Sequence, residues 1–244
     1  MSPVTTTSDG AVIVYDPQFF GKIESRFFDP EFWRAQGALT GSAVGRGTAW
    51  FVRHAGHDLV LRHFRRGGLL APVLRDRYLW NGLESTRALR EWRLLDELYR
   101  RGFPVPRPIA ARVRRRGLYY RADLMTGRIP TAISLTQALR GAPLSPEQWQ
   151  SIGRCVRRFH SAHVHHADLN ANNILLADGR IYLIDFDRGR LDAAPAQLSR
   201  NIARLKRSLD KLARRHADVH FTQADWSSLL AGYDATAPQH GIHE

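Results

Sequence analysis

The segment HHADLNANNILLADGRIYLIDFD, at positions 165–187, constrains the fold of this chain more than any other part of the sequence. It contains two short apolar runs, at positions 174–176 and 181–184. Between them, Asp178 and Gly179 form a pair that favours a tight hairpin turn with positive φ. The sequence therefore predicts a small antiparallel ribbon.

Polar side chains frame this ribbon at both ends. Asp168 and Asn173 precede its first strand, and Asp185 follows its second strand. Because antiparallel pairing brings the start of one strand beside the end of the other, these side chains are expected to meet on one side. Three oxygen-bearing groups would then share one small site.

The same residues resemble the catalytic set of protein-kinase-like enzymes, which has His-x-Asp-Leu, an Asn five positions after the Asp, and an Asp-Phe-x motif. Here His166 begins the first motif and Asp185 begins the last. Phosphoryl transfer needs a carboxylate that orients and deprotonates a hydroxyl, the role predicted for Asp168. It also needs hard oxygen ligands for Mg²⁺, the role predicted for Asn173 and Asp185.

Nucleotide-binding residues are expected upstream of these acids. Gly45 and Gly47 begin a pattern like that of a Gly-rich phosphate loop, although Trp50 replaces its third Gly. On the next predicted strand Arg62 occupies the place where kinases carry a phosphate-binding Lys, and its guanidinium fork suits phosphate or carboxylate. Glu91, on the following helix, is its predicted partner.

The distribution of apolar residues predicts an α+β protein in which a small β-rich lobe precedes a helical one. The resemblance to protein-kinase-like enzymes implies that these lobes form a two-lobed protein-kinase-like fold. Residues 1–125 read as a β-rich, nucleotide-binding lobe with one main helix, on which Ala88, Trp92, Leu95 and Tyr99 recur at helical spacing. Residues 126–244 read as a mostly helical lobe for catalysis and substrate binding. Positions 145–148, SPEQ, predict a capped helix start, and a basic amphipathic helix follows around positions 197–216.

Composition limits the possible functions. The chain has 244 residues, is 43% hydrophobic and carries a formal net charge of +13, which indicates an acidic partner such as a phosphorylated substrate, an anionic membrane surface or nucleic acid. No apolar run approaches the length of a membrane span, and the N-terminal residues do not resemble a signal peptide. We therefore expect a cytoplasmic protein that is not exported.

The sequence leaves three alternative functions open. His160, His163, His165 and His166 lie close to Asp168 in the sequence and are reminiscent of a His/Asp metal-dependent hydrolase, although the spacing H-x-H-H-x-D differs from H-x-H-x-D-H. A nucleic-acid-binding protein would explain the positive charge but would leave the acids around the hairpin without a purpose. A kinase acting on a different small molecule or on a protein is the third alternative.

The chain also resembles the lipopolysaccharide kinase family over most of its length. The resemblance rests on GRGTAWFV, LVLRHFRRGGLL, RDRYLW, TRALREWRLL, PVPRP, YYRADL and HADLNANNILL followed by LIDFDR. It implies ATP and Mg²⁺ as cofactors and transfer of the γ-phosphate to the 4-hydroxyl of 3-deoxy-D-manno-octulosonic acid (Kdo) on a lipid A precursor. It further implies a peripheral position at the cytoplasmic face of the inner membrane, with an anionic membrane surface and no nucleic acid as partner. Arg62, Trp50 and Asp187 depart from the protein-kinase pattern.

Overall fold

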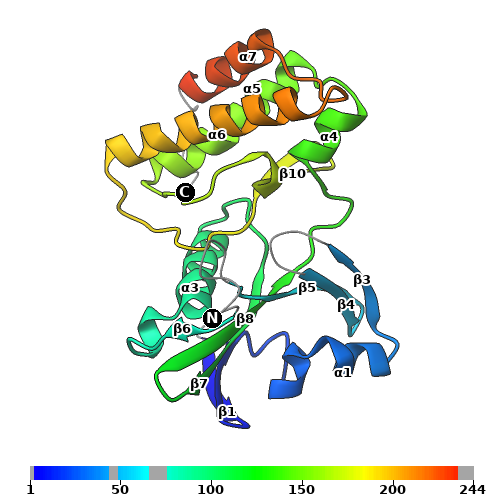
Figure 1. Ribbon diagram of the computed structural model, residues 1–244, viewed down its shortest axis with the longest axis vertical. Helices are drawn as coiled ribbons and strands as arrows, with labels where there is room; N and C mark the ends of the chain where they lie inside the picture. Colours follow the sequence, from blue (N-terminus) through cyan, green and yellow to red (C-terminus); the bar gives the residue numbers. More distant parts are fainter. Residues whose placement is uncertain (1–2, 44–48, 66–75, 236–244) are drawn as a thin grey trace, which may run out of the picture. The chain divides into compact units, whose positions relative to one another are not determined.

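The computed structural model describes residues 3–43, 49–65 and 76–235, which divide into two compact units, Met1–Pro130 and Thr131–Glu244 (Figure 1). The sequence predicted a hinge near Met125, whereas the observed division between the units follows Pro130. The difference arises because the last long strand of the first unit continues to Gly127.

The first unit is built on one antiparallel sheet whose strands follow the order β1-β2-β7-β8-β5-β4-β3, with β6 paired to β8 outside this path. The strands are β1 (Val4–Ser8), β2 (Ala11–Tyr15), β3 (Leu39–Ala43), β4 (Ala49–His54), β5 (His57–His63), β6 (Tyr78–Leu79), β7 (Pro108–Arg116) and β8 (Tyr119–Gly127).

One face of this sheet is covered by the helix α3 (Arg87–Arg100), which packs on β7 and β8. Ala88, Trp92 and Leu95 are buried, as their spacing predicted. The assignment of Tyr99 to the same stripe was wrong, because its side chain is 45% exposed. Leu98 is fully buried one position earlier in the last turn of the helix.

An N-terminal segment covers the opposite face, through the short helices η1 (Ser25–Phe28) and α1 (Pro30–Ala35). Successive strand residues point to opposite faces. Leu61 packs with Phe28 and Trp33 in one apolar cluster, whereas the next residue, Arg62, contacts Glu91 of α3. The sheet is therefore sandwiched between two helical layers.

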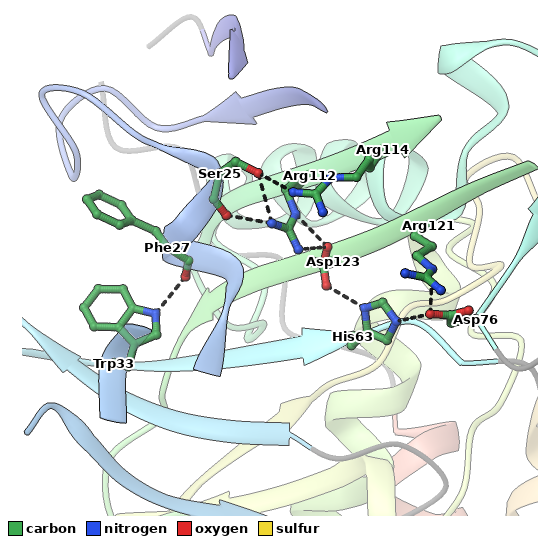
Figure 2. Close-up of polar contacts among 9 residues, drawn as sticks. All are labelled: Ser25, Phe27, Trp33, His63, Asp76, Arg112, Arg114, Arg121 and Asp123. Carbon is green, nitrogen blue, oxygen red and sulfur yellow. Dashed lines mark hydrogen bonds and ion pairs between the residues drawn. The ribbon is translucent and has the colours of Figure 1, made fainter. Parts of the chain in front are cut away.

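Polar contacts attach this N-terminal segment to the sheet (Figure 2). The Arg112 guanidinium donates to the Ser25 carbonyl at 2.6 Å and to the buried Asp123 carboxylate at 2.9 Å. His63 Nδ1 lies 2.6 Å from Asp123 Oδ1, and His63 Nε2 lies 3.3 Å from Asp76 Oδ2. Burial opposes charge on His63, but the hydrogen bonds and charges of Asp123 and Asp76 outweigh this effect and raise the pKa of the imidazole.

The second unit combines a small sheet of order β11-β10-β9 with four α-helices in its described part. The elements are β9 (Ile133–Ser134), α4 (Leu135–Gly141), α5 (Pro146–Ser161), η3 (Ala171–Asn173), β10 (Ile174–Ala177), β11 (Arg180–Leu183), α6 (Pro195–Arg215) and α7 (Gln223–Asp234). The predicted ribbon is confirmed as β10 and β11. Asp178 (φ +47°) and Gly179 (φ +74°) form its two-residue turn, because both positions require the left-handed region that the Asp-Gly pair tolerates.

The helix α5 connects local sequence signals to the packing of this unit. Ser145 and Gln148 form the predicted capping box at its start. Trp149, Ile152 and Val156 are fully buried along one face, and α5 also packs closely on α7. Within the described part of the chain, no helix combines the length and apolarity needed to span a membrane.

Candidate active site

The residues predicted to converge come from the loop between α5 and β10, at positions 162–173, and from the end of β11. We call the part at positions 165–173 the acid loop. The Asn173 side-chain amide donates to the Asp168 carbonyl at 2.9 Å, and the Ile184 N–H donates to the Asn173 carbonyl at 3.0 Å. Asp185 directly follows Ile184, so the antiparallel ribbon places these three side chains at one end, as its pattern predicted.

The backbone of Asp185 is held in an uncommon conformation. Its φ is +63°, a left-handed value that carries an energetic cost for a residue with a side chain. The next residue, Phe186, is fully buried, with its ring 5.7 Å from Phe159 and 4.6 Å from His166. This packing stabilises the turn that directs the Asp185 carboxylate.

His166 is a structural member of the acid loop. Its Nε2 donates to the Ile184 carbonyl at 2.9 Å, and its Nδ1 accepts the Asp168 N–H at 3.3 Å. Burial lowers the pKa of this imidazole, which agrees with a neutral ring that donates at one nitrogen and accepts at the other. His166 therefore ties the loop to the end of β11.

The helix α6 binds the acid loop through polar side chains on one of its faces. Asn201 accepts from the His166 N–H at 3.0 Å and donates to the His166 carbonyl at 2.9 Å. Ser208 accepts from the Ala171 N–H at 3.3 Å, and between them Arg204 pairs with the Asp168 carboxylate. Positions three or four apart share a helix face, so α6 presents a polar stripe to the loop.

Sequence reasoning missed this function of α6. It identified only the basic amphipathic pattern, in which Leu198, Leu205 and Leu209 are indeed buried. The available signal was Asn201, an amide side chain within the apolar stripe that is only 2% exposed. A buried amide needs hydrogen-bond partners, and backbone groups of another segment can supply them.

In the first unit the predicted ion pair between Arg62 and Glu91 is present. The Glu91 side chain is 1% exposed and that of Arg62 is 24% exposed. The guanidinium carbon of Arg62 also lies 4.8 Å from the centre of the Phe64 ring. These contacts fix the guanidinium at the end of β5. Gly45 and Gly47, predicted to contact a nucleotide, lie outside the described residues.

The clustered histidines are held by separate partners. His160 Nδ1 lies 2.8 Å from the Tyr233 hydroxyl, and burial lowers the pKa of His160 to about 4. His163 Nδ1 lies 3.3 Å from the Ala193 carbonyl. In the chain segments that the structure describes, no group of three or more His, Cys, Asp or Glu side chains is arranged to hold a metal ion. The arrangement does not favour the hydrolase alternative.

The donor chemistry at the ribbon end is instead that of a hard divalent cation. Asn173 uses its amide nitrogen to hold Asp168, so its carbonyl oxygen is the atom that remains as an acceptor. The Asp185 carboxylate adds oxygen ligands of the same type. Such oxygens suit Mg²⁺, which typically takes one or two protein carboxylates together with substrate phosphates.

Comparisons with known proteins identify the family of this chain. The model of the Lipopolysaccharide kinase (Kdo/WaaP) family matches residues 30–233. A 3-deoxy-D-manno-octulosonic acid kinase of Actinobacillus succinogenes is 44% identical over 86% of this chain and 90% of its own length. That of Photobacterium profundum is 42% identical over 93% and 96%, respectively. The solved structure of WaaP in complex with acyl carrier protein has a TM-score of 0.55 at 18% identity, over 91% of this chain and 88% of that chain, and shares the fold. The chain belongs to the lipopolysaccharide kinase (Kdo/WaaP) family.

Proposed function

We propose that the protein is an ATP-dependent kinase that phosphorylates Kdo in lipopolysaccharide core biosynthesis. Family membership and the names of its relatives support this activity. The structural observation that carries it is the contact of Asn173 with Asp168, at the end of the ribbon from which Asp185 projects. Phosphoryl transfer needs this combination of a carboxylate base and oxygen ligands.

Asp168 is the proposed catalytic base. It accepts the proton of the acceptor hydroxyl as the hydroxyl oxygen forms a bond to the γ-phosphorus of ATP. The bond between that phosphorus and the bridging oxygen breaks, and ADP leaves with the electron pair. Arg204 pairs with the Asp168 carboxylate, and we propose that it orients this carboxylate toward the hydroxyl.

Asn173 and Asp185 are the proposed Mg²⁺ ligands. A Mg²⁺ ion bound there with ATP would neutralise charge on the phosphates during transfer. The strained turn at Asp185 and the hydrogen bond that fixes the Asn173 side chain hold both donors before the nucleotide arrives. This preorganisation lowers the cost of assembling the site.

Arg62 is the proposed phosphate-binding cation of the first unit. Its guanidinium stays charged at any physiological pH, and its planar fork can donate to a phosphate while it remains paired with Glu91. Because Glu91 is buried against it, the pair is held in one arrangement. The same proposal assigns Gly45 and Gly47 to the nucleotide.

The finer proposal for the acceptor is the 4-hydroxyl of Kdo on a lipid A precursor, reached by peripheral association with the cytoplasmic face of the inner membrane. The formal net charge of +13 supports association with an anionic surface. A lipid-linked acceptor also fits an enzyme that works at such a surface.

The test is mass spectrometry of Kdo-bearing lipid A precursors after incubation with the protein, ATP and Mg²⁺. We expect a gain of one phosphate, located on Kdo by fragmentation. Asp168→Asn should lower kcat by about 10² to 10⁴, the usual contribution of a positioned general base. The control is Asp178→Asn in the exposed hairpin turn, where Asn tolerates the positive φ. Full transfer by Asp168→Asn, or transfer to no Kdo-bearing lipid by the wild type, would contradict the proposal.

A further inference from the structure

The two most exposed large hydrophobic side chains of the described residues lie together at one end of the first unit's sheet. Leu118 is 74% exposed and Leu79 is 58% exposed. Leu118 follows Gly117 in the two-residue turn between β7 and β8. Leu79 belongs to β6, which pairs with β8 at this end, opposite Tyr119 (Figure 1). A single exposed leucine is common on protein surfaces, but two that lie together form an apolar patch, which is the feature that marks a candidate interaction site.

Arginines surround these leucines. In β7 the last residues are Arg114, Arg115 and Arg116, all exposed. On β8, Arg121 lies directly opposite Arg114. Like charges facing each other across a sheet are destabilising in water, so this end of the sheet is suited to an anionic partner. Among the described carboxylates, Asp76 pairs with Arg121 at 2.8 Å, and Asp9 lies in the turn before Ala11, the residue paired with Arg114. Arg114 also donates to the Ser25 hydroxyl at 2.8 Å. The four arginines outnumber these carboxylates, so this end of the sheet carries a net positive charge.

Aromatic side chains lie between the apolar tip and the arginines. Trp80 is half-buried beside the turn, where its backbone N–H donates to the Leu118 carbonyl at 2.9 Å. The Arg115 guanidinium lies 4.8 Å from the centre of its ring. Tyr119, also half-buried, is paired with Arg116 on one side and with Leu79 on the other. Trp and Tyr with an apolar body and a polar atom favour the boundary between water and lipid.

We propose that this end of the sheet docks on a bilayer that contains anionic lipids. The hairpin-end surface consists of Leu79, Arg114, Arg115, Arg116, Leu118 and Arg121. Its arginines would contact lipid phosphates, while Leu118 enters the boundary between headgroups and acyl chains. A nucleic acid offers phosphates but no apolar layer for a protruding leucine. A bilayer offers phosphates at its surface and an apolar layer just below them. The flanking arginines and the leucine at the turn tip can therefore contact these two layers at the same time.

This inference rests on the proposed function only in that a lipid-linked acceptor makes docking useful, and the two are tested separately. Docking is measured by flotation with vesicles of equal parts phosphatidylglycerol and phosphatidylcholine, without ATP or acceptor. The proposed function is measured as phosphate transfer to a detergent-dispersed acceptor, which needs no bilayer. A wild type that floats but transfers no phosphate would refute the proposed function and leave the docking surface intact.

Two variants test the surface. Leu118→Ser should weaken partitioning to the mixed vesicles by about tenfold or more, from the free energy of burying one leucine side chain. Arg116→Gln should weaken it by about fivefold, in line with the contribution of one arginine near an anionic surface. The matched controls are Ile133→Ser, at an aliphatic side chain that is 45% exposed in the other unit, and Arg154→Gln, on the exposed side of α5. Both should float as the wild type does.

The proposal also predicts the effect of lipid and salt. Vesicles of phosphatidylcholine alone should bind the wild type weakly, and added salt should weaken flotation with the mixed vesicles because it screens the arginines. Circular dichroism should be unchanged in Leu118→Ser, whose side chain lies outside the core. Wild-type flotation by Leu118→Ser and Arg116→Gln together would overturn the proposal. So would a wild type that ignores the vesicles and instead binds nucleic acid, or another copy of itself, through these residues.

Discussion

Replacing Gly153 with alanine is the most direct test of how α5 and α7 pack. A Cβ at this position would lie 2.0 Å from the Leu229 carbonyl oxygen and 2.7 Å from the Tyr233 nitrogen. Gly232 approaches α5 in the same way, since its Cβ would lie 2.1 Å from the Gln150 carbonyl oxygen. Both obstacles are backbone atoms of a helix, which cannot rotate away as a flexible side chain can.

The distances set the size of the effect. Real Cβ atoms essentially never come closer than 3.0 Å to such an atom, so the two helices must separate by about 1 Å at this point, the difference between 3.0 and 2.0 Å. A gap of that size removes about a quarter to a half of the dispersion attraction between the facing atoms. Overpacking costs about 1–3 kcal/mol, and two rigid backbones place Gly153→Ala at the upper end, about 3 kcal/mol or about a hundredfold in the folding equilibrium.

Thermal and urea unfolding measure this effect. For a chain of this size we expect the Tm to fall by about 6–12 °C, from about 2–4 °C per kcal/mol. The control is Gly141→Ala at the end of α4, where a Cβ would meet nothing within 4 Å and alanine is the better helix former. If Gly153→Ala unfolds at the same temperature as Gly141→Ala, α5 and α7 do not pack through these glycines.

Three further variants address the polar contacts. Arg204→Gln should lower kcat by up to about 10²-fold, because loss of the ion pair lets the Asp168 carboxylate move away from its catalytic position. The Tm should stay close to that of the wild type, because exposed ion pairs contribute little stability. An unchanged kcat would show that Arg204 does not position the carboxylate. Arg62→Lys keeps the positive charge beside Glu91 but loses the forked guanidinium group, so the KM for ATP should rise by a larger factor than kcat falls. If the variant had the kinetic constants of the wild type, Arg62 would not contact the ATP phosphates. The pKa of His63 is raised in the folded state, so the stability contributed by its charged imidazole is complete below the ordinary pKa of 6.5 and is lost as the pH rises through the raised value. His63→Gln should therefore lower the free energy of unfolding more at acidic than at alkaline pH. A loss of stability that does not depend on pH would show that the charged imidazole does not stabilise the contacts with Asp123 and Asp76.

Local signals in the sequence were sufficient to predict the elements whose defining interactions join residues close together in the chain. The Asp178-Gly179 turn, the capping box of Ser145 and the buried stripe of α5 each depend on residues within a few positions of one another. Such interactions are encoded by spacing and residue type alone. The same locality explains why the polar end of the ribbon was predicted, since the turn that pairs the strands also aligns Asn173 with the end of β11.

The tertiary structure decided the contacts between distant segments. Arg204 reaches Asp168 across 36 positions, and Arg112 reaches Ser25 across 87 positions. No periodicity links such pairs, because the side chains meet only after helices and strands have packed. The exposure of Leu118 is of the same kind. Its position in a turn and the arginines that flank it, at positions 114–116 and 121, follow from the sequence. Leu79, however, lies 39 positions before Leu118 and joins this group only through the pairing of β6 with β8. A single sequence does not specify such a pairing between distant strands.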